Sequence, residues 1–414
     1  MNLYNNFINK IFQNPERINF RWRIIFPALI LILISCITLK YTNSDSSFFA
    51  STYMKQLVWS SIGLMLLVCM QWFRVQFLHE YAYHFYVFLL LLIFFTYFMP
   101  IIGGSQRWLL IGPLSFQPSE IGKLFLVLAL ARFISDYQGK IDDRRILLIS
   151  LLMVLMPSFM IFKQPDFGTA IVYSFIALPM LYWGNIKSYY LFSTLAPLIS
   201  IITAFNLTLF SIWMILFVIT TFYYQPKVLQ GSINFILNIS FGVIAPFIWN
   251  NILYGHQRDR ILTLLSPMRD PQGAGYQVIQ SITAIGSGGL WGKGLGQGTQ
   301  TQLRFLPVRD TDFIISVIGE EIGLFGIIII MLSFFMILSW FITYAGIISN
   351  RFLSLTLIGF VSILFVHLIV NMGMTVGLLP VTGLPVPFLS YGGSFLLTCF
   401  LLLALANNII NQHM

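Results

Sequence analysis

Long apolar segments are the feature that most restricts how this chain can fold. They recur along nearly the whole sequence, and each has roughly the 17–25 residues that a helix needs to cross a bilayer. Only 9% of the 414 residues are charged, compared with about 25% in a typical soluble domain. So little polar surface could not cover a soluble core of this size. The sequence therefore predicts an all-α, polytopic membrane protein with a single domain over residues 1–414.

The apolar segments predict about twelve membrane-spanning helices. We expect them at 24–40, 56–73, 81–100, 119–136, 146–162, 168–184, 189–205, 208–224, 232–250, 313–343, 352–379 and 389–408. The segment 313–343 is long for one span, so it is expected to tilt or to extend beyond the membrane. Lysine and arginine gather in alternate short loops, which places both termini in the cytoplasm by the positive-inside rule. This bias explains much of the net charge of +9, so no nucleic-acid partner is expected.

This orientation leaves one long loop outside the cell, at about residues 251–311. The loop is rich in glycine and in basic residues, and it keeps enough apolar residues to pack on the outer surface, partly as short helices. Long loops within compact proteins are usually functional or disordered. Here the carboxylate of Asp270 shares the loop with the cations Arg258, Arg260 and Lys293.

A carboxylate among several cations is suited to sugar transfer from a lipid pyrophosphate. With an ordinary pKa of about 3.9, Asp270 is ionised at neutral pH and can accept a proton from an attacking hydroxyl. Arginine side chains can bind phosphate in a bidentate manner and stabilise a departing pyrophosphate. Two simpler interpretations stay open. A basic loop can merely bind anionic lipid headgroups, and an aspartate before proline can merely form a turn.

Charged residues within or beside the spans are expensive, so each is a site hypothesis. Glu120 and Lys123 lie three residues apart, where they can pair to orient their helix or can line a polar cavity. Asp166, in KQPDFGTA, can cap the following helix or contribute to the same outer cavity. Of the adjacent acids Glu320 and Glu321, at least one is expected to face protein, because they point to different sides of a helix.

The remaining polar residues give weaker signals. His367 and Asn371 lie four residues apart, which predicts a polar pair between helices more than a functional site. The three cysteines lie in apolar runs and imply neither a disulfide nor a metal site. The sequence shows no carboxylate cluster for a dedicated metal, although a divalent cation on a pyrophosphate is chemically reasonable.

Several stretches combine into a specific pattern that covers most of the chain outside its middle. They are QRWLLIGPLSFQPSEIGKL, KQPDFGTA, RDRI, DPQGAGYQVIQSITAIGSGGLWGKGLG, FLP followed by TDFIISVIGEEIGLFG, and NMGMTVGLLPVTGLPVPFLSYGGS. With these motifs and their spacing, the chain resembles the SEDS family of bacterial membrane proteins, which includes FtsW, RodA and SpoVE. The run GLLPVTGLPVPFLSYGG resembles the RodA branch more than the FtsW branch.

The resemblance implies an inverting peptidoglycan glycosyltransferase in the bacterial cytoplasmic membrane. Such enzymes polymerise lipid II at the outer face of the membrane during cell elongation. The 4-hydroxyl of an acceptor attacks the anomeric carbon of the donor, undecaprenyl pyrophosphate leaves, and a β-1,4-linked glycan results. The implied partners are lipid II, a class B penicillin-binding protein and other membrane proteins of the elongation complex.

The resemblance also assigns residues. The essential aspartate of the family aligns with Asp270, which would act as the general base or orient the acceptor. Candidates to line the site come from the other matching motifs: Arg107, Glu120, Lys123, Asp166, Arg258, Arg260 and Lys293. The cations are expected to hold pyrophosphate. Alternatively, Glu120 and Lys123 hold the cavity together.

Three departures from the family pattern limit this assignment. Ser266 stands where relatives often have an acid, so Asp270 lacks that neighbour. The chain reads LPVRDTDF where relatives commonly read LPExHTDF, and no role for an acid can be carried over to Val308. The usual core of the family has ten spans, whereas this chain adds a helical hairpin at about 189–224. Because a hairpin adds two spans, the long loop stays on the outer side of the membrane.

Two other functions are compatible with the sequence. A lipid II flippase would need buried charges along a path open to both faces, to which Glu120, Lys123 and Glu320 could contribute. The inner half of the spans, however, shows few such charges. A scaffold that only activates a class B penicillin-binding protein would not need Asp270.

Overall fold

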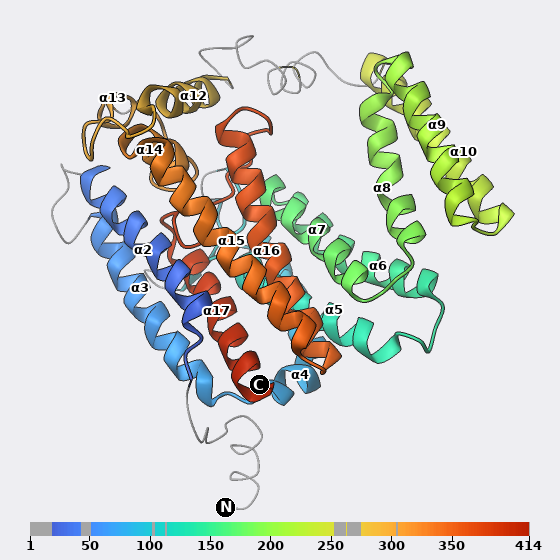
Figure 1. Cartoon of the computed structure of the whole chain (residues 1–414), viewed down its shortest axis with the longest axis horizontal. Helices are drawn as coiled ribbons and strands as arrows, with labels where there is room; N and C mark the ends of the chain where they lie inside the picture. The colour runs from blue at the N-terminus through green and yellow to red at the C-terminus, as the bar shows by residue number, and fades with distance from the viewer. Residues whose placement is uncertain are drawn as a thin grey trace, which may run out of the picture.

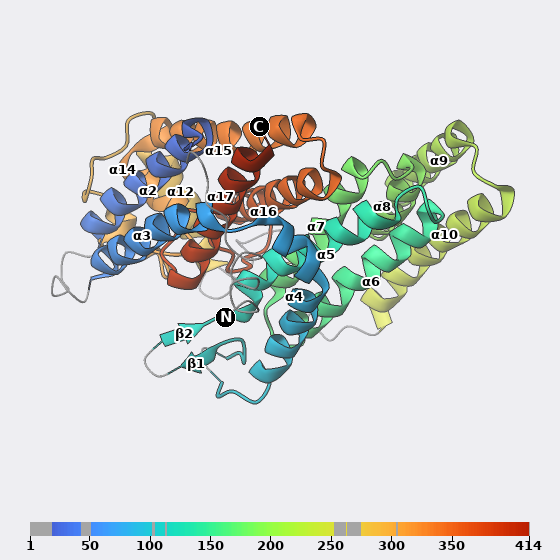
Figure 2. The ribbon, with the colours of Figure 1, turned by 90° about the horizontal axis from the view of Figure 1, so that it is seen from below.

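The computed structural model describes residues 19–42, 51–101, 104–111, 114–251, 262, 275–303 and 305–413. Within these residues the fold is helical apart from one antiparallel hairpin of β1 (Leu109–Ile111) and β2 (Leu114–Phe116). The hairpin protrudes from the helical body (Figure 2). The prediction of a polytopic helical membrane protein is confirmed.

Twelve long helices of the described chain correspond to the predicted spans, and their bounds agree to within several residues except at 313–343 (Figure 1). They are α2 (Trp22–Thr42), α3 (Thr52–Cys69), α4 (Val75–Thr96), α5 (Pro118–Tyr137), α6 (Asp143–Phe162), α7 (Phe167–Trp183), α8 (Ser188–Thr203), α9 (Leu207–Tyr224), α10 (Val228–Asn251), α15 (Gly323–Ile347), α16 (Arg351–Thr375) and α17 (Gly393–His413). Among the described helices, nine are long and apolar enough to cross a membrane. The other three are α7 and α8, which are apolar but shorter, and α5, which carries several charges.

The predicted span at 313–343 is two helices rather than one. α14 (Ile314–Glu321) ends just before Gly323, the first residue of α15. Gly323 has a φ of +78°, a left-handed conformation that residues with a side chain rarely adopt. A Cβ atom there would lie 2.3 Å from the backbone nitrogen of Gly292. Glycine therefore ends one helix and lets the loop backbone pack directly against the start of the next.

α16 and α17 lie at the centre of the bundle and are buried along most of their length. α16 packs against α5, α7 and α15, while α17 packs against α3 and α5. The crossing of α5 and α16 depends on Gly359, where an added Cβ atom would lie 2.3 Å from Cγ1 of Val127. Small residues at such crossings let helices approach closely, which increases van der Waals contact between apolar surfaces.

α8, α9 and α10 form a separate layer at one side of the bundle (Figures 1 and 2). α8 contacts α7, and the three helices otherwise pack mainly on one another. Within α9, only Phe217 is buried. α8 and α9 occupy the hairpin expected at about 189–224. Their exposed apolar side chains are suited to contact with lipid rather than with water.

The described part of the long loop includes two short helices, as its apolar residues predict. α12 (Tyr276–Gly288) packs against α14, and α13 (Thr299–Gln302) follows a glycine-rich turn. Residues 252–261 and 263–274 of this loop lie outside the described residues. The described part of the loop therefore packs on α14, the helix that follows it.

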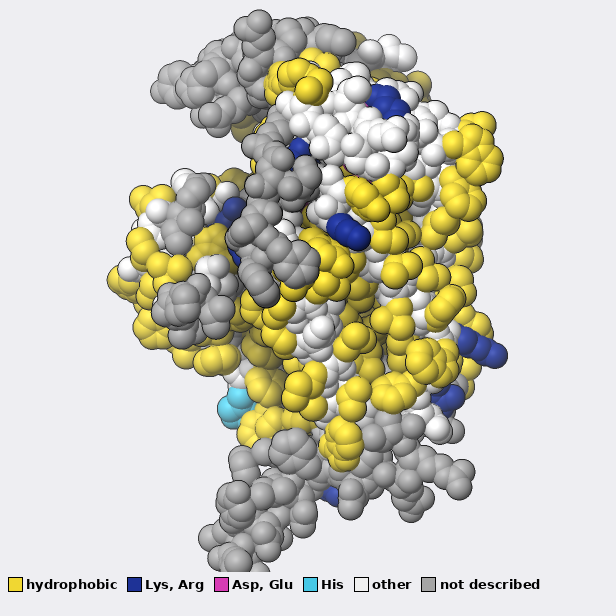
Figure 3. Space-filling view, turned by 90° about the vertical axis from the view of Figure 1, so that its left-hand side faces the viewer, with side chains coloured by type: hydrophobic (Ala, Val, Ile, Leu, Met, Phe, Trp, Pro, Cys, Tyr) yellow, Lys and Arg dark blue, Asp and Glu magenta, His cyan; other side chains and the backbone are white. Residues whose placement is uncertain are grey.

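Hydrophobic side chains cover most of the face that includes α2 and α3 (Figure 3). Exposed residues of these two helices include Phe26, Leu33, Leu64 and Met65. A contiguous apolar surface of this extent would promote aggregation in water, but in a bilayer it is the normal contact with lipid tails.

We expect two glycines of α12 to respond differently to replacement by alanine. A Cβ atom at Gly288 would lie 1.9 Å from the carbonyl oxygen of Gly319, whereas a Cβ atom at Gly286 meets nothing within 4 Å. Gly288→Ala should therefore destabilise the protein by about 1–3 kcal/mol. Gly286→Ala should be neutral, or stabilising by up to about 1 kcal/mol. Thermal unfolding of both variants in detergent checks this, and equal effects would contradict the packing of α12 on α14.

Candidate functional site

A buried triad of polar side chains lies near the start of α5. Lys123 is fully buried, and its Nζ atom lies 2.8 Å from Oε2 of Glu120 and 2.8 Å from Nε2 of His367. Glu120 is one turn earlier on α5, while His367 comes from α16. The structure thus pairs Glu120 with Lys123, as their spacing predicts, and adds His367 as a second partner.

Hydrogen bonding determines the proton positions in this triad. Nδ1 of His367 lies 2.9 Å from the carbonyl oxygen of Pro385, which can only accept, so Nδ1 carries a proton. Nε2 of the neutral ring then accepts a hydrogen bond from the Lys123 ammonium. The same ammonium lies 5.2 Å from the ring centroid of Phe395, within the range of a cation–π contact. Lys123 is therefore held by protein groups on three sides, which favours the structural role over phosphate binding.

A second cluster surrounds Asp166, which caps the N-terminus of α7. Its carboxylate accepts the backbone N–H of Thr169 at 3.2 Å and the side-chain amide of Gln117 at 2.9 Å. Nη1 of Arg107 lies 3.5 Å from Oδ2 of the same carboxylate. The side chain of Asp166 is 4% exposed, whereas that of Arg107 is 34% exposed. Asp166 is thus both a helix cap and the anchor of Arg107, which remains partly accessible.

Asp312 is a further acid near this cluster, and it was not among the residues predicted from the sequence. Burial raises the pKa of its carboxyl group above the usual range, and a hydrogen bond from Thr311 and the guanidinium of Arg107 oppose this shift only in part. The available signal was its place in the motif TDFIISVIGEEIGLFG. Spacing alone could not show it, because Asp312 and Arg107 are far apart in the sequence.

His367 and Asn371 each bond to groups outside their own helix, as the prediction of a polar pair between helices implies. The side-chain amide of Asn371 donates to the carbonyl oxygens of Asp312 at 2.8 Å and of Leu384 at 2.6 Å. His367 donates to Pro385, as described above. Both side chains therefore satisfy irregular backbone, between α16 and α17 and, for Asn371, also just before α14. This is how buried loops are tolerated at membrane depth.

Lys293 forms an ion pair with Glu320, a contact that its assignment as a phosphate ligand did not anticipate. Its Nζ atom lies 2.9 Å from Oε1 of Glu320, whose side chain is fully buried. Backbone N–H groups of Gln300 and Thr301 donate to the same carboxylate at 3.0 and 3.1 Å. Burial alone would raise the pKa of Glu320, but the bonds from Lys293, Gln300 and Thr301 together lower it below the usual range.

Glu321 contrasts with its neighbour Glu320. Its side chain is also buried, and the backbone N–H of Gly296 only partly compensates its carboxylate, because among the described residues no donor reaches either oxygen with good hydrogen-bond geometry. Burial raises the pKa of Glu321 to about 7, with a smaller contribution from the negative charge of Glu320. The two acids therefore do face different surroundings, as their adjacent positions on α14 predict.

The structure brings together only some of the predicted site residues. Glu120 lies with Lys123, and Arg107 lies with Asp166, whereas Lys293 is bound to Glu320 in the outer loop. The remaining predicted residues, Asp270, Arg258 and Arg260, lie outside the described residues. Among the described residues, no group of three or more His, Cys, Asp or Glu side chains is arranged to hold a metal ion.

Sequence comparison gives a family match along the whole described chain. The chain matches the family described as cell cycle protein FtsW/RodA/SpoVE over residues 17–228 and 212–414. It is 34% identical to the peptidoglycan glycosyltransferase MrdB of Escherichia coli strain K12 over 338 residues, which cover 81% of this chain and 80% of MrdB. It is 30% identical to the peptidoglycan glycosyltransferase RodA of Treponema pallidum, over 92% of this chain and 95% of that one.

Structure comparison shows the same fold in solved proteins. A chain from a structure titled "Structural coordination of polymerization and crosslinking by a peptidoglycan synthase complex" matches with a TM-score of 0.73 and 24% identity, covering 96% of this chain and 99% of that one. The crystal structure of the rod shape determining protein RodA of Thermus thermophilus matches with a TM-score of 0.63 and 22% identity, over the same shares. These similarities concern the fold.

We expect Lys123→Met to destabilise the protein by about 3–5 kcal/mol, because it leaves Glu120 as a buried charge without its cation. Adding Glu120→Gln should restore much of this loss, since the double variant buries no unpaired charge. Thermal unfolding in detergent measures both effects.

Activity of the double variant separates the two interpretations of Lys123. If Lys123 only holds the helices together, the stable double variant keeps its activity. A double variant that is stable but inactive would instead place Lys123 in contact with substrate.

Proposed function

Because this chain belongs to the FtsW/RodA/SpoVE family of cell cycle proteins, we propose that it is a peptidoglycan glycosyltransferase that polymerises lipid II during cell elongation. The observation that carries the proposal is extended similarity to curated glycosyltransferases, which spans about four fifths or more of both chains. The resemblance of the late motif to the RodA branch supports elongation over division.

The proposed reaction is an inverting displacement at the anomeric carbon of the donor. The 4-hydroxyl oxygen of an acceptor lipid II forms a bond to this carbon as the bond to the pyrophosphate oxygen breaks. Asp270 takes the hydroxyl proton, as a general base must in an inverting sugar transfer. Cations stabilise the charge that develops on the departing undecaprenyl pyrophosphate.

The cations that could bind pyrophosphate differ in how accessible their contacts leave them. Lys123 is enclosed by Glu120 and His367, and Lys293 is bound to Glu320. Arg107 is the most accessible of these three cations, because a third of its side chain is exposed while Asp166 holds it in place. Arg107, with Arg258 and Arg260 of the outer loop, is thus our candidate set for pyrophosphate. A divalent cation could add to this charge, but the described residues offer it no dedicated set of ligands.

The proposed setting is the bacterial cytoplasmic membrane, with both termini in the cytoplasm and the loop at about 251–311 outside. The likeness to a chain of a synthase complex that joins polymerisation to crosslinking supports a partner of the transpeptidase type. We propose a class B penicillin-binding protein as this partner, with other membrane proteins of the elongation complex around it.

We expect Asp270→Asn to lower lipid II polymerisation by about 10²–10⁴-fold, because the amide cannot take up the hydroxyl proton. The assay uses the purified full chain with its transpeptidase partner and lipid II, and it follows glycan product on gels. Asp259→Asn, in the same loop, is the matched control and should retain most of the activity. Thermal unfolding shows that both variants are folded.

Two outcomes would contradict this assignment. Full product from a folded Asp270→Asn variant would remove Asp270 from the reaction and would favour a scaffold that only activates its partner. Flipping of lipid II in liposomes by both the parent chain and the Asp270→Asn variant, without polymer from either, would instead indicate a flippase.

A further inference from the structure

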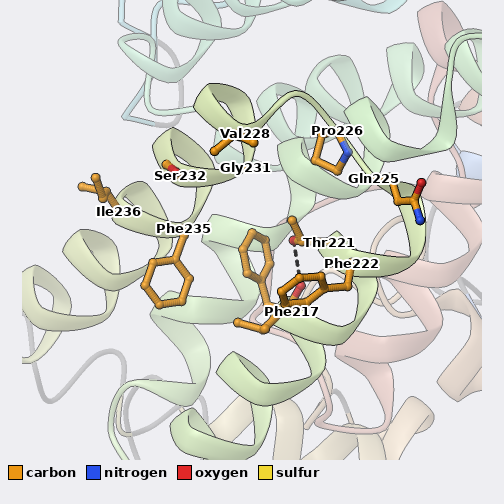
Figure 4. Close-up of a pocket in the computed structure, with 11 residues that line it drawn as sticks. Phe217, Thr221, Phe222, Gln225, Pro226, Val228, Gly231, Ser232, Phe235 and Ile236 are labelled. Carbon is orange, nitrogen blue, oxygen red and sulfur yellow. Dashed lines mark hydrogen bonds between the residues drawn. The ribbon is translucent and has the colours of Figure 1, made fainter.

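An apolar groove opens between α9 and α10, near the turn that joins them (Figure 4). Its volume is about 550 Å³, within the range of about 300–1,000 Å³ typical of small-molecule sites. Its lining includes Phe217, Phe222, Val228, Gly231, Ser232 and Phe235. The groove lies in the side layer, away from the polar clusters of α5 and α7.

The lining of the groove is suited to a hydrocarbon chain. Phe217 is buried at its base, while Phe222 is 77% exposed and Val228 is 86% exposed. The hydroxyl of Thr221 donates to the carbonyl oxygen of Phe217 at 2.8 Å, so this polar group is already satisfied. In helices that span a membrane, large apolar side chains with so much exposed surface favour contact with a lipid tail.

Charge is distributed unevenly around this groove. Between residues 167 and 251 the sequence has no acidic residue, and its only charged residues are Lys187 and Lys227. Lys227 stands between Pro226 and Val228, which both line the groove. Both lysines are exposed. A patch with two cations and no anion attracts an anionic headgroup.

The two lysines lie at the same end of the side layer. Lys187 directly precedes α8 and Lys227 directly precedes α10. α8 and α10 pack on each other, and near this end the side-chain amide of Asn234 donates to the hydroxyl of Tyr189 at 2.7 Å. The ring of Tyr189 lies 6.1 Å from that of Tyr224, at the end of α9. The basic side chains and the open end of the groove therefore share one membrane interface.

We propose that this groove is an accessory site for an anionic phospholipid, with one acyl chain against Phe217, Phe222 and Phe235 and the headgroup phosphate near Lys227 and Lys187. In the proposed orientation, the lipid belongs to the cytoplasmic leaflet, on the side opposite the outer loop. The site is separate from the proposed polymerisation chemistry, and its occupation can be measured without lipid II.

Photolabelling tests the site directly. The full chain is placed in nanodiscs that contain a phosphatidylglycerol with a diazirine in its acyl chain, and labelled peptides are mapped by mass spectrometry. We expect adducts to concentrate in residues 217–236. Ser232→Phe, which fills the groove, should reduce these adducts severalfold. Ser211→Phe is the matched control, because Ser211 is exposed on α9 but does not line the groove.

Replacement of Lys227 tests whether the site binds an anionic headgroup. Lys227→Gln should reduce labelling by the phosphatidylglycerol probe about fivefold, since each basic residue near the surface contributes modestly to anionic lipid binding. Labelling by a phosphatidylcholine probe should not change, and Lys163→Gln in another loop should affect neither probe. Lys227 is exposed, so its replacement leaves folding intact.

Three results would overturn the proposal. Adducts spread evenly over α8, α9 and α10, or equally reduced by Ser232→Phe and Ser211→Phe, would indicate ordinary lipid contact without a site. Equal labelling by phosphatidylglycerol and phosphatidylcholine, unaffected by Lys227→Gln, would exclude anionic selectivity. Displacement of the probe by added polyprenyl phosphate but not by unlabelled phosphatidylglycerol would assign the groove to a substrate tail instead.

Discussion

Burial of the Lys123 ammonium inside an apolar helical bundle is the constraint on which the membrane part of this structure depends. An isolated charge in this environment costs several kcal/mol, so its partners must be supplied by the fold. They come from α5 as Glu120 and from α16 as His367, and His367 is oriented in turn by the carbonyl oxygen of Pro385. The triad thereby fixes α5, α16 and the irregular segment before α17 relative to one another.

A second buried carboxylate organises the described part of the long loop by the same principle. Glu320 accepts hydrogen bonds from Lys293, Thr299 and Thr301, and it holds the glycine-rich turn against α14. α12 packs on the same helix through Gly288. The described part of this loop is thus attached to α14, which is the property that the proposed polymerisation would need to hold its catalytic groups at a fixed position.

Hydropathy predicted the spans well, because bilayer thickness and backbone hydrogen bonding impose strong rules on apolar segments. The break before Gly323 was not predicted, since its cause is the close approach of Gly292, which lies far away in the sequence. The same limit applies to the site. Lys293 looked like a free cation because a sequence shows charges but not their partners. The sequence likewise could not show that the half-buried acid Asp312 lies within the electrostatic influence of Arg107.

The central claim is that the loop carrying Asp270 stands on the outer side of the membrane, opposite the turn between α9 and α10. Cysteine labelling tests it most directly, after Cys36, Cys69 and Cys399 have been replaced by alanine. In intact spheroplasts, a membrane-impermeant maleimide should label the Asp270→Cys variant at once, whereas the Lys227→Cys variant should be labelled only after permeabilisation. The reverse pattern would place the proposed base in the cytoplasm and contradict polymerisation at the outer face.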